Sequence, residues 1–139
     1  MEEKSTRTIL LAEDDVVLQE MYKERLLAEG YSVDLAKDGL EALSKIASTT
    51  PDLMILDVMM PNLNGIDVLK KIKAQDKTKN IPIIVATALV QDMTEIKKML
   101  SEQDSYLIKS EVMPGDVVKL VNQKLSGASA TTTTTTPTG

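Results

Sequence analysis

Short apolar runs alternate with segments of helical periodicity along most of the 139-residue chain. Each run is ended by acidic, turn-forming or other polar residues, which is typical of strands buried in a parallel sheet. We therefore predict strands at 8–12, 31–36, 53–60, 81–88 and 105–110. The second strand is less apolar than the others, which favours a place at an edge of the sheet.

Between these runs, apolar residues recur every three or four positions, as in amphipathic helices. Gly30 is expected to end the first helix, and Asp38 with Glu41 resembles a capping box at the start of the second. The strict alternation of strand and helix predicts a (βα)5 fold: a doubly wound, five-stranded parallel sheet with helices on both faces. The residues expected on the buried helix faces are Leu18, Met21, Tyr22 and Leu26; Leu40, Leu43 and Ala47; Ile66, Leu69 and Ile72; Met93, Ile96 and Leu100; and Val117, Leu120, Val121 and Leu125.

The two ends of the chain lack an apolar period. Residues 1–6 are polar and are expected to be flexible, and residues 126–139 form an uncharged, Thr-rich segment that is expected to be a disordered tail. A single domain over residues 7–125 remains. No effector domain is expected after Leu125, so any output must pass through contacts with another protein.

Composition narrows the classes of protein. A hydrophobic content of 42% suffices for one core, filled by Leu, Ile, Val and eight Met because Phe and Trp are absent. The formal net charge of −5, without a basic patch interleaved with aromatics, argues against a direct nucleic-acid partner. No run approaches the roughly 18 apolar residues of a membrane span, and the first residues do not resemble a signal peptide, so a cytoplasmic protein is expected. The absence of Cys and His excludes disulfides, thiol nucleophiles, imidazole bases and the usual zinc sites.

Polar residues end four of the predicted strands. In an open parallel sheet the carboxyl ends of the strands meet at one edge, where ligands bind. Taken singly, each polar residue could be a solvated turn residue or a helix cap, and Asp15 is expected to be only a cap. That reading does not explain why five of them share one edge: Glu13 and Asp14, Asp57, Thr87, and Lys109.

The acids at this edge point to phosphate chemistry. Neighbouring carboxylates repel one another unless a cation compensates, and with oxygen ligands alone the natural cation is Mg²⁺. A carboxylate can also attack phosphorus and form an aspartyl phosphate. Mg²⁺, Lys109 and the Thr87 hydroxyl could then neutralise the transferred group. We predict that Asp57 is the acceptor, because it is an acid at the end of a central, otherwise apolar strand.

The segments "ILLAEDD", "MILDVMMPNLNG", "IVATA" and "YLIK" resemble, in order and spacing, the receiver domains of bacterial two-component response regulators, most closely the stand-alone chemotaxis-type form. The resemblance covers about residues 7–125 and implies a flavodoxin-like fold. It implies that a histidine kinase or phosphotransfer protein supplies the phosphoryl group. It also implies that an unidentified protein target is reached through the fourth helix, fifth strand and fifth helix.

The resemblance also assigns roles to single residues. Asp57 would accept the phosphoryl group, and Tyr106 stands where the family places its aromatic switch residue. The residues implied to hold Mg²⁺ are Glu13, Asp14, Asp57 and Met59, the last through its main-chain carbonyl. Thr87 would hydrogen-bond the phosphoryl group, and Lys109 would pair with it.

One position departs from the family pattern, and two other classes remain open. Lys109 is followed by Ser110, where the family usually has a proline, often after a cis bond. An aspartate-based phosphatase would carry a second acid two residues after its nucleophile, where this chain has Met59, and would need a cap domain. A receiver-like interaction module that is never phosphorylated would gain nothing from clustered carboxylates. We expect no enzyme in the usual sense, only a protein that catalyses its own aspartyl phosphorylation and dephosphorylation.

Overall fold

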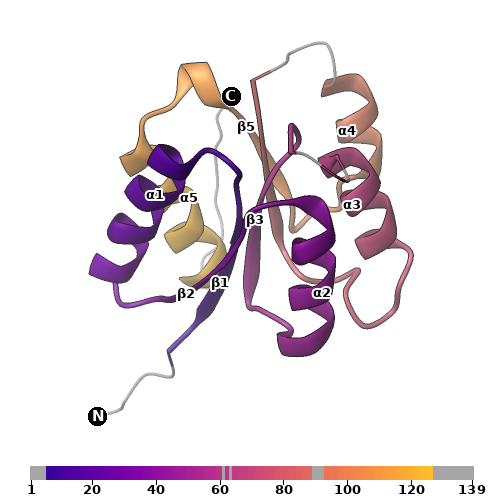
Figure 1. The fold of residues 1–139 in the computed structure, drawn as a ribbon, viewed down its shortest axis with the longest axis horizontal. Helices are drawn as coiled ribbons and strands as arrows, with labels where there is room; N and C mark the ends of the chain where they lie inside the picture. Colours follow the sequence, from indigo (N-terminus) through magenta and orange to yellow (C-terminus); the bar gives the residue numbers. More distant parts are fainter. Residues whose placement is uncertain (1–5, 61, 63, 89–92, 127–139) are drawn as a thin grey trace.

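The computed structural model describes residues 6–60, 62, 64–88 and 93–126. Figure 1 shows one sheet between two layers of helices. The predicted flexible N-terminus and Thr-rich tail lie, apart from Thr6 and Ser126, outside the described residues. The elements are β1 Thr8–Ala12, α1 Val16–Ala28, β2 Ser32–Ala36, α2 Gly39–Thr49, β3 Leu53–Asp57, α3 Gly65–Lys73, β4 Ile83–Thr87, α4 Met93–Met99, β5 Ser105–Ile108, a 3₁₀ helix Lys109–Glu111, and α5 Pro114–Ser126.

The five strands are parallel and lie in the order β2-β1-β3-β4-β5. The predicted doubly wound fold is therefore confirmed, and so is the place of β2 at an edge. Strand order reverses direction between β1 and β3, because the chain passes from β1 outward to β2 and then returns to the other side of β1. A crevice opens at the carboxyl ends of the strands at such a switch point, and ligands bind there.

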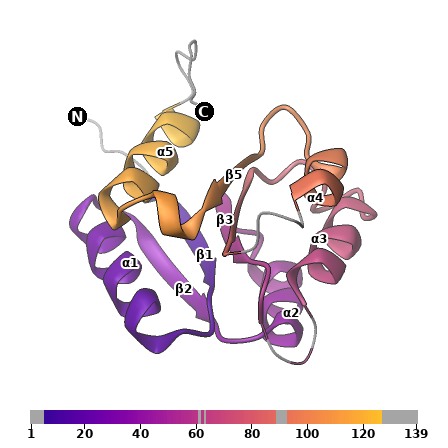
Figure 2. The same ribbon diagram turned by 90° about the horizontal axis from the view of Figure 1, so that it is seen from above.

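Two apolar clusters fill the faces of the sheet. Helices α1 and α5 cover one face, and α2, α3 and α4 cover the other (Figure 2). Strands β3 and β4 are buried along their whole length, as expected of central strands covered on both faces. Among the described residues, no helix is long and apolar enough to cross a membrane.

The predicted buried face of the second helix was wrong at two of its three residues. Leu40 is 59% exposed and Ala47 is also exposed, whereas Gly39, Ala42 and Ile46 are buried. The helix begins directly after its N-cap, and the buried stripe follows the three-to-four-residue repeat from Gly39. The third predicted residue, Leu43, is partly buried against the core. Met21 of the first helix is likewise 40% exposed, although it was expected to be buried.

The helix termini follow the local signals. Asp15 is the N-cap of α1 and accepts hydrogen bonds from the amides of Val17 and Leu18, so its predicted role as a cap is confirmed. Asp38 caps α2 through the amide of Glu41. Gly30 follows the C-cap of α1 with a φ of +97°, a left-handed conformation that favours glycine.

A buried acid holds the opposite, amino-terminal edge of the sheet together. The carboxylate of Asp104 accepts the amides of Ile83 at 2.9 Å and Ser101 at 2.8 Å. It also pairs with the Nζ of Lys73, whose side chain is 14% exposed. These contacts join α3, β4 and the segment before β5, far from the carboxyl ends of the strands.

Candidate functional site

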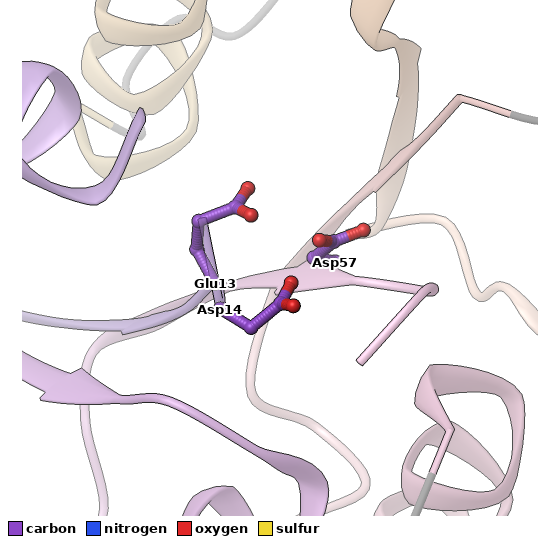
Figure 3. Close-up of side chains that lie close together, drawn as sticks. All are labelled: Glu13, Asp14 and Asp57. Carbon is purple, nitrogen blue, oxygen red and sulfur yellow. The ribbon is translucent and has the colours of Figure 1, made fainter. Parts of the chain in front are cut away.

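Three carboxylates converge at the switch point of the sheet. Glu13 and Asp14 directly follow β1, and Asp57 is the last residue of the neighbouring β3. One carboxylate oxygen from each lies within 4.8 Å of the others, and Figure 3 shows the three side chains around one space at the strand ends. The predicted cluster of acids is therefore present in the structure.

Glu13 is held at both its side chain and its backbone. It is 2% exposed; its Oε2 accepts the amide of Asp15 at 3.0 Å, and its Oε1 accepts Lys109 Nζ at 3.0 Å. Its amide donates to the carbonyl of Ala36 at 3.0 Å, and its carbonyl accepts Gln19 Nε2 at 2.9 Å. Burial, followed by the charge of Asp57, raises the pKa of Glu13 from 4.5 to about 7.

Lys109 bridges two of the acids. It begins the 3₁₀ helix after β5, and its Nζ lies 3.0 Å from Glu13 Oε1 and 3.2 Å from Asp57 Oδ2. Burial alone would lower the pKa of the Lys109 ammonium, but the hydrogen bonds and charges of the two acids raise it above 10.5. Lys109 therefore stays charged. No peptide bond of the described residues is cis, so the bond to Ser110 is trans.

Asp57 is fixed by the backbone that follows it. It is 3% exposed, and its Oδ1 accepts the amide of Met59 at 3.0 Å. The amide of Gly65 bonds back to the carbonyl of Val58 at 2.7 Å. A Cβ on Gly65 would lie 2.5 Å from Val58 Cα and 2.6 Å from the Asp57 carbonyl, so only glycine fits there. The turn after β3 thus brings the start of α3 against the end of β3.

Asp14 differs from the other two acids because it is exposed. Three carboxylates, two buried and one exposed, give hard oxygen donors of the kind that Mg²⁺ prefers. The donor set therefore fits a divalent cation with room for water. The Met59 carbonyl as a further ligand stays a prediction.

Thr87 and Tyr106 lie on neighbouring strands. Thr87 ends β4 and is fully buried. Tyr106 of β5 is paired with Val85, two residues before Thr87. Paired residues of parallel strands share a face, as do residues two apart, so the side chains of Thr87 and Tyr106 are on the same face. The ring of Tyr106 is 39% exposed, and Lys97 Nζ lies 5.1 Å from its centre.

Sequence reasoning brought the acids, Thr87 and Lys109 to one edge but missed two supporting residues. Gly65 ends the segment "MILDVMMPNLNG", but the segment does not reveal that the backbone of Gly65 lies against the end of β3. Gln19 carried no signal, since one glutamine on a helix is usually a solvated side chain. Only the folded chain shows that it reaches the carbonyl of Glu13.

Comparison with known proteins gives a consistent result. Residues 9–122 match the family "Response regulator receiver domain". This chain is 40% identical to response regulator MprA of Mycobacterium avium and to MprA of Mycobacterium tuberculosis. Each alignment spans 101 residues, which is 73% of this chain. The chain covers 43% of each, so it spans less than half the length of these curated relatives.

Solved structures with this fold include receiver domains from several sources. The receiver domain of sensor histidine kinase PA1611 from Pseudomonas aeruginosa PAO1 has a TM-score of 0.77 at 26% identity, and the match covers 88% of this chain and 100% of that one. It holds a magnesium ion in its active-site cleft. Chemotaxis response regulator CheY4 of Vibrio cholerae has a TM-score of 0.76 at 26% identity, covering 86% and 99% of the two chains.

Proposed function

Because this chain belongs to the response regulator receiver domain family, we propose that Asp57 accepts a phosphoryl group from a histidine kinase or phosphotransfer protein. The observation that carries the proposal is the buried Asp57 carboxylate at the end of a central strand, with Lys109 Nζ 3.2 Å away and two further acids beside it. A solvated turn residue would need none of these neighbours.

In the proposed reaction an Asp57 carboxylate oxygen forms a bond to phosphorus, and the bond from phosphorus to the donor's histidine nitrogen breaks. The leaving imidazole keeps the electron pair. The hydrogen bond from the Met59 amide to Oδ1 orients the carboxylate. In such transfers the protein mainly positions the reactants and neutralises charge.

Lys109 neutralises part of that charge. Its ammonium already lies between Glu13 and Asp57, so a short movement of its side chain would bring it to a phosphoryl oxygen. Glu13, Asp14 and Asp57 would hold Mg²⁺, with the Met59 carbonyl as a further ligand. When bound, Mg²⁺ screens the acids from one another and from the phosphoryl oxygens.

We further propose that Thr87 and Tyr106 convert attachment into a signal. A phosphoryl group brings charge and acceptor oxygens close to the Thr87 hydroxyl. Movement of Thr87 toward the phosphate would leave space on the face that it shares with Tyr106. The half-exposed ring of Tyr106 could rotate into this space and change the surface of α4, β5 and α5, where a downstream protein would bind.

Mass spectrometry tests the assignment of the acceptor. After incubation with acetyl phosphate and Mg²⁺, the parent should gain the mass of one phosphoryl group, which hydroxylamine should remove because an acyl phosphate is labile to it. Asp57→Asn should gain none. Asp76→Asn is the matched control, since the side chain of Asp76 is 95% exposed and lies between α3 and β4, before the amino-terminal end of β4. An adduct that persists in Asp57→Asn would overturn the proposal.

A further inference from the structure

The acidic segment after β1 is held by a side chain outside it. Only Glu13, Asp14 and Asp15 separate β1 from α1. Gln19, one turn into α1, donates its Nε2 to the carbonyl of Glu13 at 2.9 Å. Its own amide bonds to the carbonyl of Asp15 at 2.8 Å, which places Gln19 directly over this segment.

The bond from Gln19 orients the residue that follows Glu13. The carbonyl of Glu13 and the amide of Asp14 belong to one planar peptide group. Holding that carbonyl therefore holds the peptide group on the amino side of Asp14. On the other side, the amide of Asp15 is held by Glu13 Oε2 at 3.0 Å. Asp14 thus lies between two anchored peptide groups, so neither of its backbone dihedrals can change freely.

This anchoring matters most for Asp14 because its side chain is exposed. Packing holds Glu13 and Asp57, which are 2% and 3% exposed, but Asp14 depends on its backbone to direct its carboxylate toward the other two. Of the two anchors, Glu13 Oε2 belongs to a candidate metal ligand, so metal binding competes with it. The amide of Gln19 takes no part in holding the metal.

We propose that Gln19 is a positioning residue that preorganises Asp14 for Mg²⁺ binding. The inference rests on the proposed metal site and goes beyond it, since Gln19 touches neither the metal nor the phosphoryl group. It predicts a specific pattern. Without the Gln19 bond the empty site samples more arrangements of Asp14, so Mg²⁺ binds more weakly, but the loaded site reacts as before.

The variant is Gln19→Met, which keeps an unbranched side chain of similar length and helix propensity but removes the donor. Gln103→Met is the matched control. Gln103 also donates its Nε2 to a backbone carbonyl, that of Lys79 at 3.3 Å. It lies just before the amino-terminal end of β5, whereas the acids lie at the carboxyl ends of the strands. Thermal unfolding in EDTA would establish that both variants are folded.

The measurement is a titration with Mg²⁺ alone, followed by backbone amide NMR shifts. Gln19→Met should bind Mg²⁺ about two- to tenfold more weakly than the parent, the factor expected for one ordinary hydrogen bond. Gln103→Met should bind it like the parent. At saturating Mg²⁺, the rate of phosphorylation by acetyl phosphate should be within about twofold of the parent for both variants.

Each contrary outcome has a distinct meaning. Equal Mg²⁺ affinities for Gln19→Met and the parent would overturn the role of Gln19 and leave the proposed function intact. Equal weakening in Gln103→Met would assign the effect to general loosening of the fold and also overturn it. A rate that stays low at saturating Mg²⁺ would show that Gln19 does not act through metal affinity. A parent that does not respond to Mg²⁺ would refute the metal site itself, and the inference with it.

Discussion

Replacement of Glu13 by glutamine should stabilise the metal-free protein at neutral and alkaline pH. Glu13 is 2% exposed and shares its site with Asp57, and these two effects raise its pKa from 4.5 to about 7. Because the folded-state value lies above the unfolded one, the folded protein binds the proton more tightly. The stability from this group is fully present below about pH 4.5 and is lost as pH rises through about 7.

The size of the effect follows from the two pKa values. A change from 4.5 to about 7 corresponds to roughly 3 kcal/mol of unfolding free energy, as an upper bound. The hydrogen bond from Lys109 lowers the pKa of Glu13 and is already contained in the value of about 7, whereas relaxation of the site around the charge reduces the gain below this bound. We therefore expect Glu13→Gln to be about 1–2 kcal/mol more stable than the parent at about pH 8 in EDTA. At about pH 5 the difference should be near zero.

Urea unfolding followed by circular dichroism at several pH values measures this difference. Other carboxylates change the stability of both proteins with pH, so the informative quantity is the difference between them. Saturating Mg²⁺ at about 100 times its dissociation constant should stabilise the parent by roughly 2.7 kcal/mol and the variant by less. Glu24→Gln, at an exposed position of α1, is the control and should show no pH-dependent gain. A pH-independent difference, or a less stable Glu13→Gln at about pH 8, would refute the reasoning.

Three further variants test other parts of the structure. Asp104→Ala should lower the unfolding free energy by about 3 kcal/mol in urea, because it leaves the Lys73 ammonium without its counter-ion and two amides without their acceptor; a loss below about 1 kcal/mol would show that water replaces the carboxylate. Gly65→Ala should lower stability by more than about 2 kcal/mol and slow phosphorylation, because its methyl would meet the backbone of Val58 at 2.5 Å and that of Asp57 at 2.6 Å; an unchanged rate would contradict this. Lys97→Gln should let the ring of Tyr106 turn inward about two- to fivefold more often with a phosphate mimic bound, since the ammonium no longer holds the ring outside. Fluorotyrosine NMR can follow the ring because the chain has three Tyr, and an equal shift in Lys98→Gln would argue against a specific contact.

The sheet and its acidic edge were predictable because they depend on local patterns and one topological rule. An apolar run followed by an acid recurs at the ends of β1 and β3, and parallel strands bring such ends together whatever the details of packing. The place of β2 at the edge followed from its lower apolar content. These features need only the alternation of elements, which the sequence shows directly.

Features that depend on helix phase or on side-chain reach were not predictable in the same way. Leu40 is the largest apolar residue near the start of α2, yet it faces solvent because the N-cap at Asp38 sets the phase of the helix. The bond from Gln19 to Glu13 depends on one rotamer. The position of Tyr106 over Lys97 depends on how α4 packs beside β5.

The charges at the site also suggest an order of events. Three carboxylates, those of Glu13, Asp14 and Asp57, lie together, and the Lys109 ammonium pairs with two of them, Glu13 and Asp57, so negative charge is in excess before any ligand arrives. The phosphoryl group carries about 1.5 to 2 negative charges and replaces the single charge of the Asp57 carboxylate, so the site gains up to about one further negative charge, which the cluster would repel. The repulsion between the acids and the raised pKa of Glu13 both favour a cation in this space. We therefore expect Mg²⁺ to bind first and phosphorylation to follow, since only the metal-loaded site can accept the added charge with Lys109 still in place.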